Sequence, residues 1–205
     1  MSVSFQKNGY EVVRNVLSKD LLENLKINFQ MVRDLEFFYS GQPNKFAYGD
    51  HQTEKSFCIY AARFFESLGI QLTDKVSEIV DVELVPTYTY ARIYYEGAEL
   101  NPHKDGERCE YSTTLCLDTT DPWDFYIKDR NGEDKVVKLN PGDMCVYAGY
   151  ELEHWRDMYQ GEMQMQCFLH YVNPMGKYAE LKYDGRPMMG VGTKICTVLL
   201  DEGQS

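Results

Sequence analysis

Residues 83–95, ELVPTYTYARIYY, decide the fold class because they alternate with a period of two. Successive side chains of a strand point to opposite faces, so the alternation predicts a strand with one face on a core. Five further stretches have the same character: STTLCLD (112–118), DFYIKD (124–129), DKVVKLN (134–140), DMCVYAG (143–149) and MQMQCFLHYV (163–172). About eight short strands at this spacing predict a closed double sheet, a jelly roll or a barrel.

Turn signals separate these stretches: Glu96-Gly97, Asp105-Gly106, Asp121-Pro122, Asn131-Gly132 and Pro141-Gly142. Asn-Gly is the strongest short hairpin signal, because both residues tolerate a positive φ. We therefore expect a hairpin with its turn at residues 131–132.

The first part of the chain has helical spacing instead. Ser18 and Asp20 are predicted to open a helix that carries Leu21, Leu22, Leu25, Phe29 and Val32. A second helix is predicted over residues 54–67, and a third from a Thr73 cap onward, while residues 10–17 (YEVVRNVL) suggest a short strand. We expect one α+β domain over residues 1–205, with mainly helical support in 1–81, a β core in 82–173 and a tail or lid in 174–205.

Composition excludes several classes of function. The 205 residues are 43% hydrophobic and carry a formal net charge of −11. A nucleic-acid-binding protein needs a basic face, and the dispersed lysines and arginines do not supply one. No apolar stretch is long enough for a membrane span or signal peptide, so we expect a cytoplasmic protein without a membrane or nucleic-acid partner. The six cysteines form no CxxC motif and are predicted to be free thiols.

Residues 100–111, LNPHKDGERCEY, contain the first chemical signal. His103 and Asp105 are two apart, so on an extended segment both side chains point the same way, and Pro102 favours extended geometry before it. Two histidines and one carboxylate commonly hold a divalent metal with open positions. The alternative interpretation is a solvated surface turn.

A third ligand has to come from His154 or His170. His154 follows a Pro-Gly-Asp turn and is expected to begin a strand, whereas His170 lies late in the apolar stretch CFLHYV (167–172). We favour His154 as the ligand and expect His170 to be a hydrogen-bonded histidine beside the site or in the core. His51 is interpreted as a loop residue.

Three longer stretches resemble the iron(II)- and 2-oxoglutarate-dependent dioxygenases, in particular the prolyl-4-hydroxylase-like group. YYEGAELNPHKD (94–105) is similar to that family's tyrosine, glycine and His-x-Asp stretch, and LNPGDMCVYAGYELEHWRD (139–157) to the segment with the distal histidine. QCFLHYVNPMGKYAELKYDGRP (166–187) looks like phage and cyanobacterial members. The resemblance covers residues 82–173, and FQKNGYEVVRNVLSKDLLENL (5–25) also looks like the family's opening strand and helix.

The resemblance implies a double-stranded β-helix core of the jelly-roll or cupin-like type, supported by the N-terminal helices. It also implies an iron ion bound by His103, Asp105 and His154, with 2-oxoglutarate as cosubstrate. Tyr94 occupies the position of a tyrosine that hydrogen-bonds the cosubstrate in that family. The implied activity is hydroxylation of a small-molecule or peptidyl substrate, prolyl included, with consumption of molecular oxygen and release of succinate and CO2. Asp105 argues against halogenation, because related halogenases lack that carboxylate.

The sequence departs from the family at the anchor for the distal carboxylate of 2-oxoglutarate. Members usually place a Lys or Arg about ten residues after the distal histidine, but no basic residue occurs between Arg156 and Lys177. The aligned inward positions are Gln164 and Gln166, whose neutral amides cannot neutralise a buried carboxylate. We expect Arg156, two residues past His154, to be the anchor, with Arg92 as the second candidate.

Two other functions remain open from the sequence. The missing basic residue suits a cupin-like metalloenzyme that does not use 2-oxoglutarate. A strand-rich interaction protein without enzymatic activity would need none of these ligands.

Overall fold

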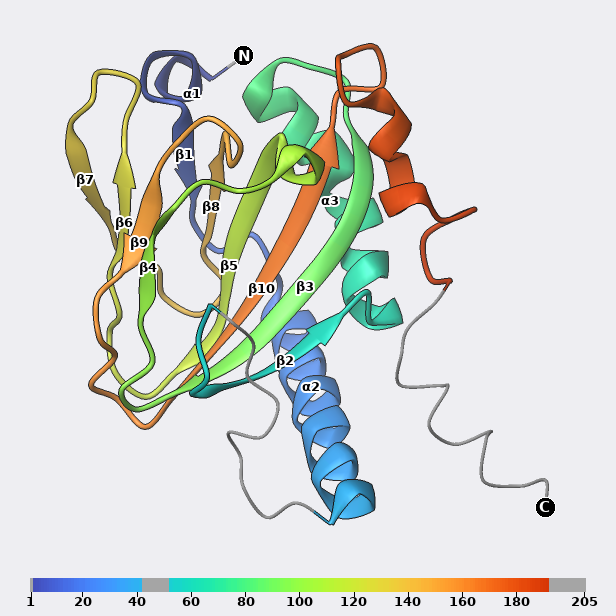
Figure 1. The fold of residues 1–205 in the computed structure, drawn as a ribbon, viewed down its shortest axis with the longest axis vertical. Helices are drawn as coiled ribbons and strands as arrows, with labels where there is room; N and C mark the ends of the chain where they lie inside the picture. The colour runs from blue at the N-terminus through green and yellow to red at the C-terminus, as the bar shows by residue number, and fades with distance from the viewer. Residues whose placement is uncertain (1, 42–51, 192–205) are drawn as a thin grey trace.

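The computed structural model describes residues 2–41 and 52–191. The fold consists of two antiparallel sheets, and helices α2 and α3 lie behind the larger sheet (Figure 1). The larger sheet has the order β1-β8-β5-β10-β3-β2 and the smaller one β4-β9-β6-β7. The predicted strand-rich α+β fold is therefore confirmed.

The element bounds follow the alternating stretches closely. The larger sheet consists of β1 (Tyr10–Val13), β8 (Met144–Tyr147), β5 (Tyr111–Thr119), β10 (Met163–Val172), β3 (Val85–Tyr95) and β2 (Ser56–Tyr60). The smaller sheet consists of β4 (Leu100–His103), β9 (His154–Arg156), β6 (Phe125–Lys128) and β7 (Asp134–Val137). The helices are α1 (Val3–Asn8), α2 (Lys19–Ser40), α3 (Arg63–Val80) and the 3-10 helices η1 (Glu107–Cys109) and η2 (Ala179–Gly185).

Strand β3 shows how the period of two places the core. Ala91 and Ile93 are fully buried in the main hydrophobic core, which also contains Phe65 and Leu68 of α3. Arg92 and Tyr94, on the opposite face of the same strand, line a cavity instead. One face of the larger sheet thus packs on the helices, and the other face is available for a site.

The predicted hairpin at residues 131–132 is confirmed. Strands β6 and β7 pair antiparallel across it, and Gly132 has a φ of 81°. The Asp129 carboxylate accepts hydrogen bonds from the backbone N–H groups of Asn131 (2.8 Å) and Glu133 (3.0 Å), which holds the turn.

The first predicted helix is confirmed, with Ser18 as its N-cap: the Ser18 hydroxyl accepts a hydrogen bond from the backbone N–H of Leu21. The prediction for residues 54–67 is wrong in its first half, because residues 56–60 form β2 on the edge of the larger sheet. A short apolar run fits either structure, and here pairing with β3 decides it. Ala61 has a φ of 52° and ends the strand just before α3.

The predicted third helix is part of the second. Thr73 lies inside α3, and its hydroxyl donates to the carbonyl oxygen of Gly69 (2.9 Å) one turn earlier. A threonine can therefore satisfy its hydroxyl within a helix as well as at a cap.

The remaining expectations concern the cysteines, His51 and membrane spans. Cys58, Cys109, Cys116, Cys145 and Cys167 are free thiols, as predicted, whereas Cys196 and His51 lie outside the described residues. Within the described ranges, no helix has both the length and the apolar character needed to span a bilayer.

Candidate metal centre and its cavity

Strands β4 and β9 place two histidines side by side. His103 at the end of β4 and His154 at the start of β9 are direct partners in the antiparallel register. Side chains of register partners lie on the same face, and the two ring centroids are 4.3 Å apart. Strand pairing therefore brings together residues that are remote in the sequence.

Both imidazole rings are oriented by a backbone carbonyl two residues earlier. The Nδ1 atom of His103 lies 2.8 Å from the carbonyl oxygen of Asn101, and that of His154 lies 2.9 Å from the carbonyl oxygen of Leu152. A carbonyl only accepts, so each Nδ1 carries a proton, and in the neutral tautomer Nε2 is the atom available to a metal. Metal-binding histidines commonly have this arrangement.

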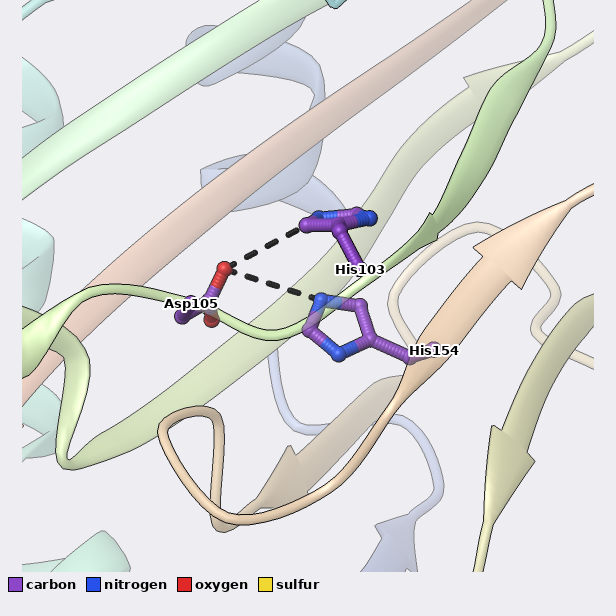
Figure 2. Close-up of side chains that lie close together, drawn as sticks. All are labelled: His103, Asp105 and His154. Carbon is purple, nitrogen blue, oxygen red and sulfur yellow. Dashed lines mark ion pairs between the residues drawn. The ribbon is translucent and has the colours of Figure 1, made fainter.

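Asp105 completes the cluster from the loop after β4 (Figure 2). Its Oδ1 lies 3.9 Å from Nε2 of His103 and 3.6 Å from Nε2 of His154. Its backbone N–H donates to the carbonyl oxygen of Gly149 (3.0 Å), which fixes the loop against the segment after β8. Donor atoms of the three side chains all lie within 4.8 Å of one another.

The local electrostatics favour the metal-binding protonation states. Burial would raise the pKa of the Asp105 carboxyl, but His154, His170 and Ser112 outweigh burial and hold that pKa well below its usual range. Burial and the nearby His154 lower the pKa of His103. An ionised carboxylate and a neutral imidazole are the forms that ligate a cation, so the donor set fits a divalent first-row metal.

A second group of metal-binding side chains shares Asp105. Donor atoms of Asp105, Cys109 and His170 also lie within 4.8 Å of one another. The Ser112 hydroxyl is within hydrogen-bonding distance of both the carboxylate and the His170 ring. A hydroxyl thus already links two members of this second group.

A cavity of about 230 Å³ adjoins the three side chains. It lies between the two sheets, because its walls come from β3 and β10 of the larger sheet and from β4, β6 and β9 of the smaller one. The lining residues are Gln52, Tyr88, Tyr90, Arg92, Tyr94, Leu100, His103, Asp105, Phe125, Tyr147, His154, Arg156, Phe168 and His170.

Arg156 is a buried cation in the wall of this cavity, with 2% of its surface exposed. One guanidinium nitrogen, Nη1, donates to the carbonyl oxygen of Trp123 (2.8 Å), and the group lies 4.9 Å from the Trp123 ring centroid. The other, Nη2, has no hydrogen-bond partner among the described residues, and no carboxylate there forms an ion pair with Arg156. Burial lowers the pKa of Arg156, as expected for a charge that has lost its water.

Two more buried polar side chains near this face lack partners within the described ranges. Both amide atoms of Gln166 on β10 and the hydroxyl of Thr114 on β5 make no hydrogen bond. Gln164 differs, because its Oε1 accepts a hydrogen bond from the Thr119 hydroxyl (2.9 Å). An unsatisfied buried polar group is costly, so Arg156, which lines the cavity, favours a polar ligand there.

The remaining sequence candidates lie as follows. Tyr94 is fully buried against Trp123, with ring centroids 4.9 Å apart. Arg92 donates to Oε1 of Gln52 (2.6 Å) and stacks 5.1 Å above the Tyr90 ring. Gln164 is the register partner of Tyr94, and Gln166 is that of Arg92, so both glutamines lie on the same face of the sheet as these residues. Neither glutamine lines the cavity.

No protein-family model matches the chain, and no curated protein does. Solved structures do match. A Pseudomonas putida prolyl-4-hydroxylase is 15% identical, with a TM-score of 0.62 over 83% of this chain and 95% of its own. HygX from Streptomyces hygroscopicus, solved with nickel, 2-oxoglutarate and hygromycin B, is 14% identical, with a TM-score of 0.64 over 83% and 85%. The epimerase SnoN, in complex with Fe³⁺, alpha ketoglutarate and nogalamycin RO, is 12% identical, with a TM-score of 0.66 over 92% and 89%.

The chain shares the fold of these proteins. At such low identity the likeness extends to the fold alone, so the role of each side chain has to be argued from the geometry described above.

Several residues of the site were not predicted from the sequence. Tyr88 and Tyr90 line the cavity, and their alternation in phase with Arg92 and Tyr94 on β3 could have revealed them. Ser112 and Gly149 touch the Asp105 carboxylate region without any motif to mark them. Their role depends on how β5 and β8 pack beside the loop at residue 105, which no local pattern encodes.

Proposed function

We propose that the chain is an Fe(II)- and 2-oxoglutarate-dependent oxygenase, built as a single double-stranded β-helix domain with the metal between its two sheets. The observation that carries the proposal is the convergence of His103, Asp105 and His154, with both Nε2 atoms turned toward one carboxylate oxygen. Three such ligands on one side leave positions for a cosubstrate and oxygen. When bound, iron with 2-oxoglutarate and oxygen supplies the oxidation of an unactivated C–H bond, with succinate and CO2 as products.

Arg156 is the proposed anchor for the distal carboxylate of 2-oxoglutarate. A buried guanidinium with an unused Nη2 needs an anion to offset its lost hydration, and a carboxylate supplies charge and acceptors together. Gln166 and Thr114 also have unpartnered polar atoms, but neither side chain lines the cavity, so the anchor is assigned to Arg156 alone. Arg92 is the second candidate, and Gln164 is less suited because Thr119 already uses its oxygen.

Tyr94 has the proposed role of orienting the cosubstrate through its hydroxyl. The ring is fixed by Trp123, and the residue lines the cavity that also contains Arg156 and the three proposed ligands. A phenol held in one rotamer can hydrogen-bond a carboxylate without a large loss of side-chain entropy.

A small molecule is the favoured substrate class, with a peptidyl side chain, prolyl included, as the alternative. Support comes from the fold relatives HygX and SnoN, whose structures contain hygromycin B and nogalamycin RO. The cavity wall is largely aromatic, from Tyr88, Tyr90, Phe125 and Phe168 among others, and such walls suit compact organic substrates. The five cysteines within the described residues are free thiols, which suits the cytoplasm as the working compartment, since ferrous iron persists under reducing conditions.

Thermal melting with redox-silent Mn²⁺ and 2-oxoglutarate tests the proposal. A ligand that binds only the native state raises the melting temperature by mass action. We expect Mn²⁺ to stabilise the protein, 2-oxoglutarate to add to this only when Mn²⁺ is present, and His103→Ala or Asp105→Ala to abolish both effects. If Mn²⁺ stabilises wild-type protein but 2-oxoglutarate adds nothing, a cupin-like metalloenzyme without 2-oxoglutarate is favoured. The neutral side chains of Gln164 and Gln166 would suit such an enzyme. Absence of both stabilising effects would favour a non-enzymatic interaction protein.

A further inference from the structure

The two oxygens of the Asp105 carboxylate have different neighbours. Oδ1 faces the Nε2 atoms of His103 and His154 at 3.9 Å and 3.6 Å. Oδ2 faces the hydroxyl of Ser112, whose Oγ lies 3.0 Å away. One oxygen is therefore directed to the proposed metal and the other to the protein interior.

The Ser112 hydroxyl also contacts a third histidine. Its Oγ lies 2.9 Å from Nδ1 of His170. Ser112 on β5 and His170 on β10 are direct partners in the antiparallel register, so both side chains leave the sheet on the same face. Ser112 is fully buried and His170 is 5% exposed, so water does not compete for these contacts.

The protons in this chain of contacts can be assigned from the chemistry. A carboxylate only accepts, so the Ser112 hydroxyl donates to Oδ2 of Asp105 at 3.0 Å, while its other acceptor, the carbonyl oxygen of Cys109, lies farther away at 3.4 Å. Ser112 Oγ must then accept from His170, which places a proton on Nδ1 of that ring. The direction of the hydrogen bonds thus follows from the contacts of Ser112 alone.

Other groups pack closely around the hydrogen bonds that link Asp105, Ser112 and His170. The His170 ring packs on the Tyr88 ring with centroids 4.5 Å apart. A Cβ atom on Gly149 would overlap both Oδ2 of Asp105 and Oγ of Ser112, and would lie only 2.8 Å from the carbonyl oxygen of Cys109. The carboxylate and the hydroxyl therefore occupy the space beside Gly149 that a side chain would need, and the hydrogen bond from Ser112 holds Oδ2 there.

We propose that Ser112 and His170 are positioning residues that fix the Asp105 carboxylate for metal binding, through a hydrogen-bonded chain that runs from His170 Nδ1 through Ser112 Oγ to Asp105 Oδ2. The inference rests on the proposed function, because it takes Asp105 as a metal ligand. It also explains why a third histidine lies beside the site: His170 orients a ligand. Removing a hydrogen-bonded partner behind a ligand typically lowers metal affinity about 10–100-fold.

Matched variants separate this role from packing. Ser112→Ala removes the hydroxyl. His170→Asn keeps an N–H donor near the position of Nδ1, whereas His170→Leu has a similar shape to Asn and no donor. Thr113→Val is the control on the same strand: it removes a buried hydroxyl whose recorded partner is the backbone N–H of Leu169, on the face turned away from Asp105.

The measurement is the dissociation constant for Mn²⁺ by calorimetry, with Co²⁺ absorption spectra at saturating metal as the readout of ligand geometry. Melting of each metal-free variant sets a temperature at which all are folded. We expect about 10–100-fold weaker Mn²⁺ binding and an altered Co²⁺ spectrum for Ser112→Ala and His170→Leu, with His170→Asn and Thr113→Val close to wild type.

Two results would overturn the inference by different routes. Wild-type affinity and spectra in Ser112→Ala and His170→Leu would refute the positioning role and leave the metal site intact. Failure of wild-type protein to bind Mn²⁺, or binding that persists in Asp105→Ala, would refute the proposed function itself.

Discussion

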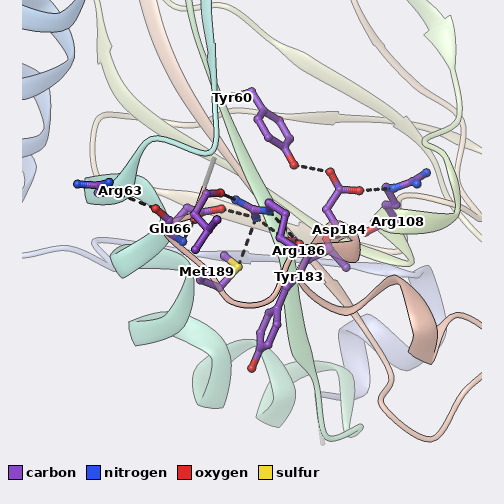
Figure 3. A network of polar contacts seen from close by, with 11 residues as sticks. Tyr60, Arg63, Glu66, Arg108, Tyr183, Asp184, Arg186 and Met189 are labelled. Carbon is purple, nitrogen blue, oxygen red and sulfur yellow. Dashed lines mark hydrogen bonds and ion pairs between the residues drawn. The ribbon is translucent and has the colours of Figure 1, made fainter. Parts of the chain in front are cut away.

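Glu66 on α3 and Arg186, just after η2, form a buried ion pair with 2.6 Å between Oε1 and Nη2 (Figure 3). The Glu66 side chain is 1% exposed and that of Arg186 13%. Arg186 also donates to the carbonyl oxygen of Thr87 on β3, and Asp184 bonds both the Tyr60 hydroxyl and Arg108 of η1. Residues 184–186 are thereby joined to α3, to β3 and, through Arg108, to the helix η1 that follows Asp105.

Glu66→Gln should destabilise the protein strongly. It leaves the Arg186 charge buried without its counter-charge, and breaking one side of a buried pair costs about 3–5 kcal/mol. Urea unfolding measures the loss. Glu23→Gln, which removes the exposed partner of Lys26 on α2, should change the free energy of unfolding by less than about 0.5 kcal/mol. Equal effects of the two changes would show that the Glu66–Arg186 pair is not a structural tie.

Gly149→Ala should disrupt the metal centre. The added methyl group would overlap the Asp105 carboxylate and the Ser112 hydroxyl, and overpacking of this kind costs about 1–3 kcal/mol. We expect a lower free energy of unfolding and weaker Mn²⁺ binding. Gly106→Ala is the matched control, because Gly106 directly follows Asp105 and a Cβ there meets nothing within 4 Å. Normal Mn²⁺ binding by Gly149→Ala would contradict the close packing around Asp105.

The strands were predictable because their signal is local. In β3, the alternation of Ala91, Arg92, Ile93 and Tyr94 already separates the core face from the cavity face. The same reasoning gave the wrong element at residues 56–60, since a five-residue apolar run fits a helix as well as an edge strand. Only pairing with β3 distinguishes the two, and pairing is a long-range property.

The residues of the site also differ in whether the local sequence marks them. The spacing of His103 and Asp105 indicates two ligands by itself, because i and i+2 share a face of an extended segment. The preference for His154 over His170 came from its place at the start of a strand, where β9 indeed begins. Ser112 carries no such signal: it is one small polar residue on a buried strand, and it matters because β5, β10 and the loop at residue 105 meet there.

Metal-free protein should lose stability as the pH falls from about 6.5 to about 4. The pKa of His170 is lowered to about 4 in the folded state, while an unfolded histidine has a value near 6.5. Between these values the unfolded chain binds a proton that the native protein does not, so the free energy of unfolding decreases with falling pH, by up to about 3 kcal/mol. Burial and His154 also lower the pKa of His103, which adds to the same slope.

Urea unfolding at several pH values, with a chelator present, measures this dependence. His170→Asn removes one titrating group and should flatten the curve in this window, leaving the smaller slope from His103. An unchanged slope in His170→Asn would mean that the ring at position 170 is not kept neutral by burial.

Arg156→Met should lower cosubstrate affinity without lowering stability. Replacing a buried, incompletely bonded cation by an apolar side chain of similar length removes its desolvation cost, so the free energy of unfolding should be unchanged or higher. Loss of the charge that pairs with a buried carboxylate should weaken 2-oxoglutarate binding by about 2–5 kcal/mol, at least about 30-fold. Calorimetry in the presence of Mn²⁺ measures this, with Mn²⁺ affinity itself as the internal control. Arg92→Met is the comparison: if that variant loses 2-oxoglutarate and Arg156→Met retains it, the anchor is on β3 instead of β9.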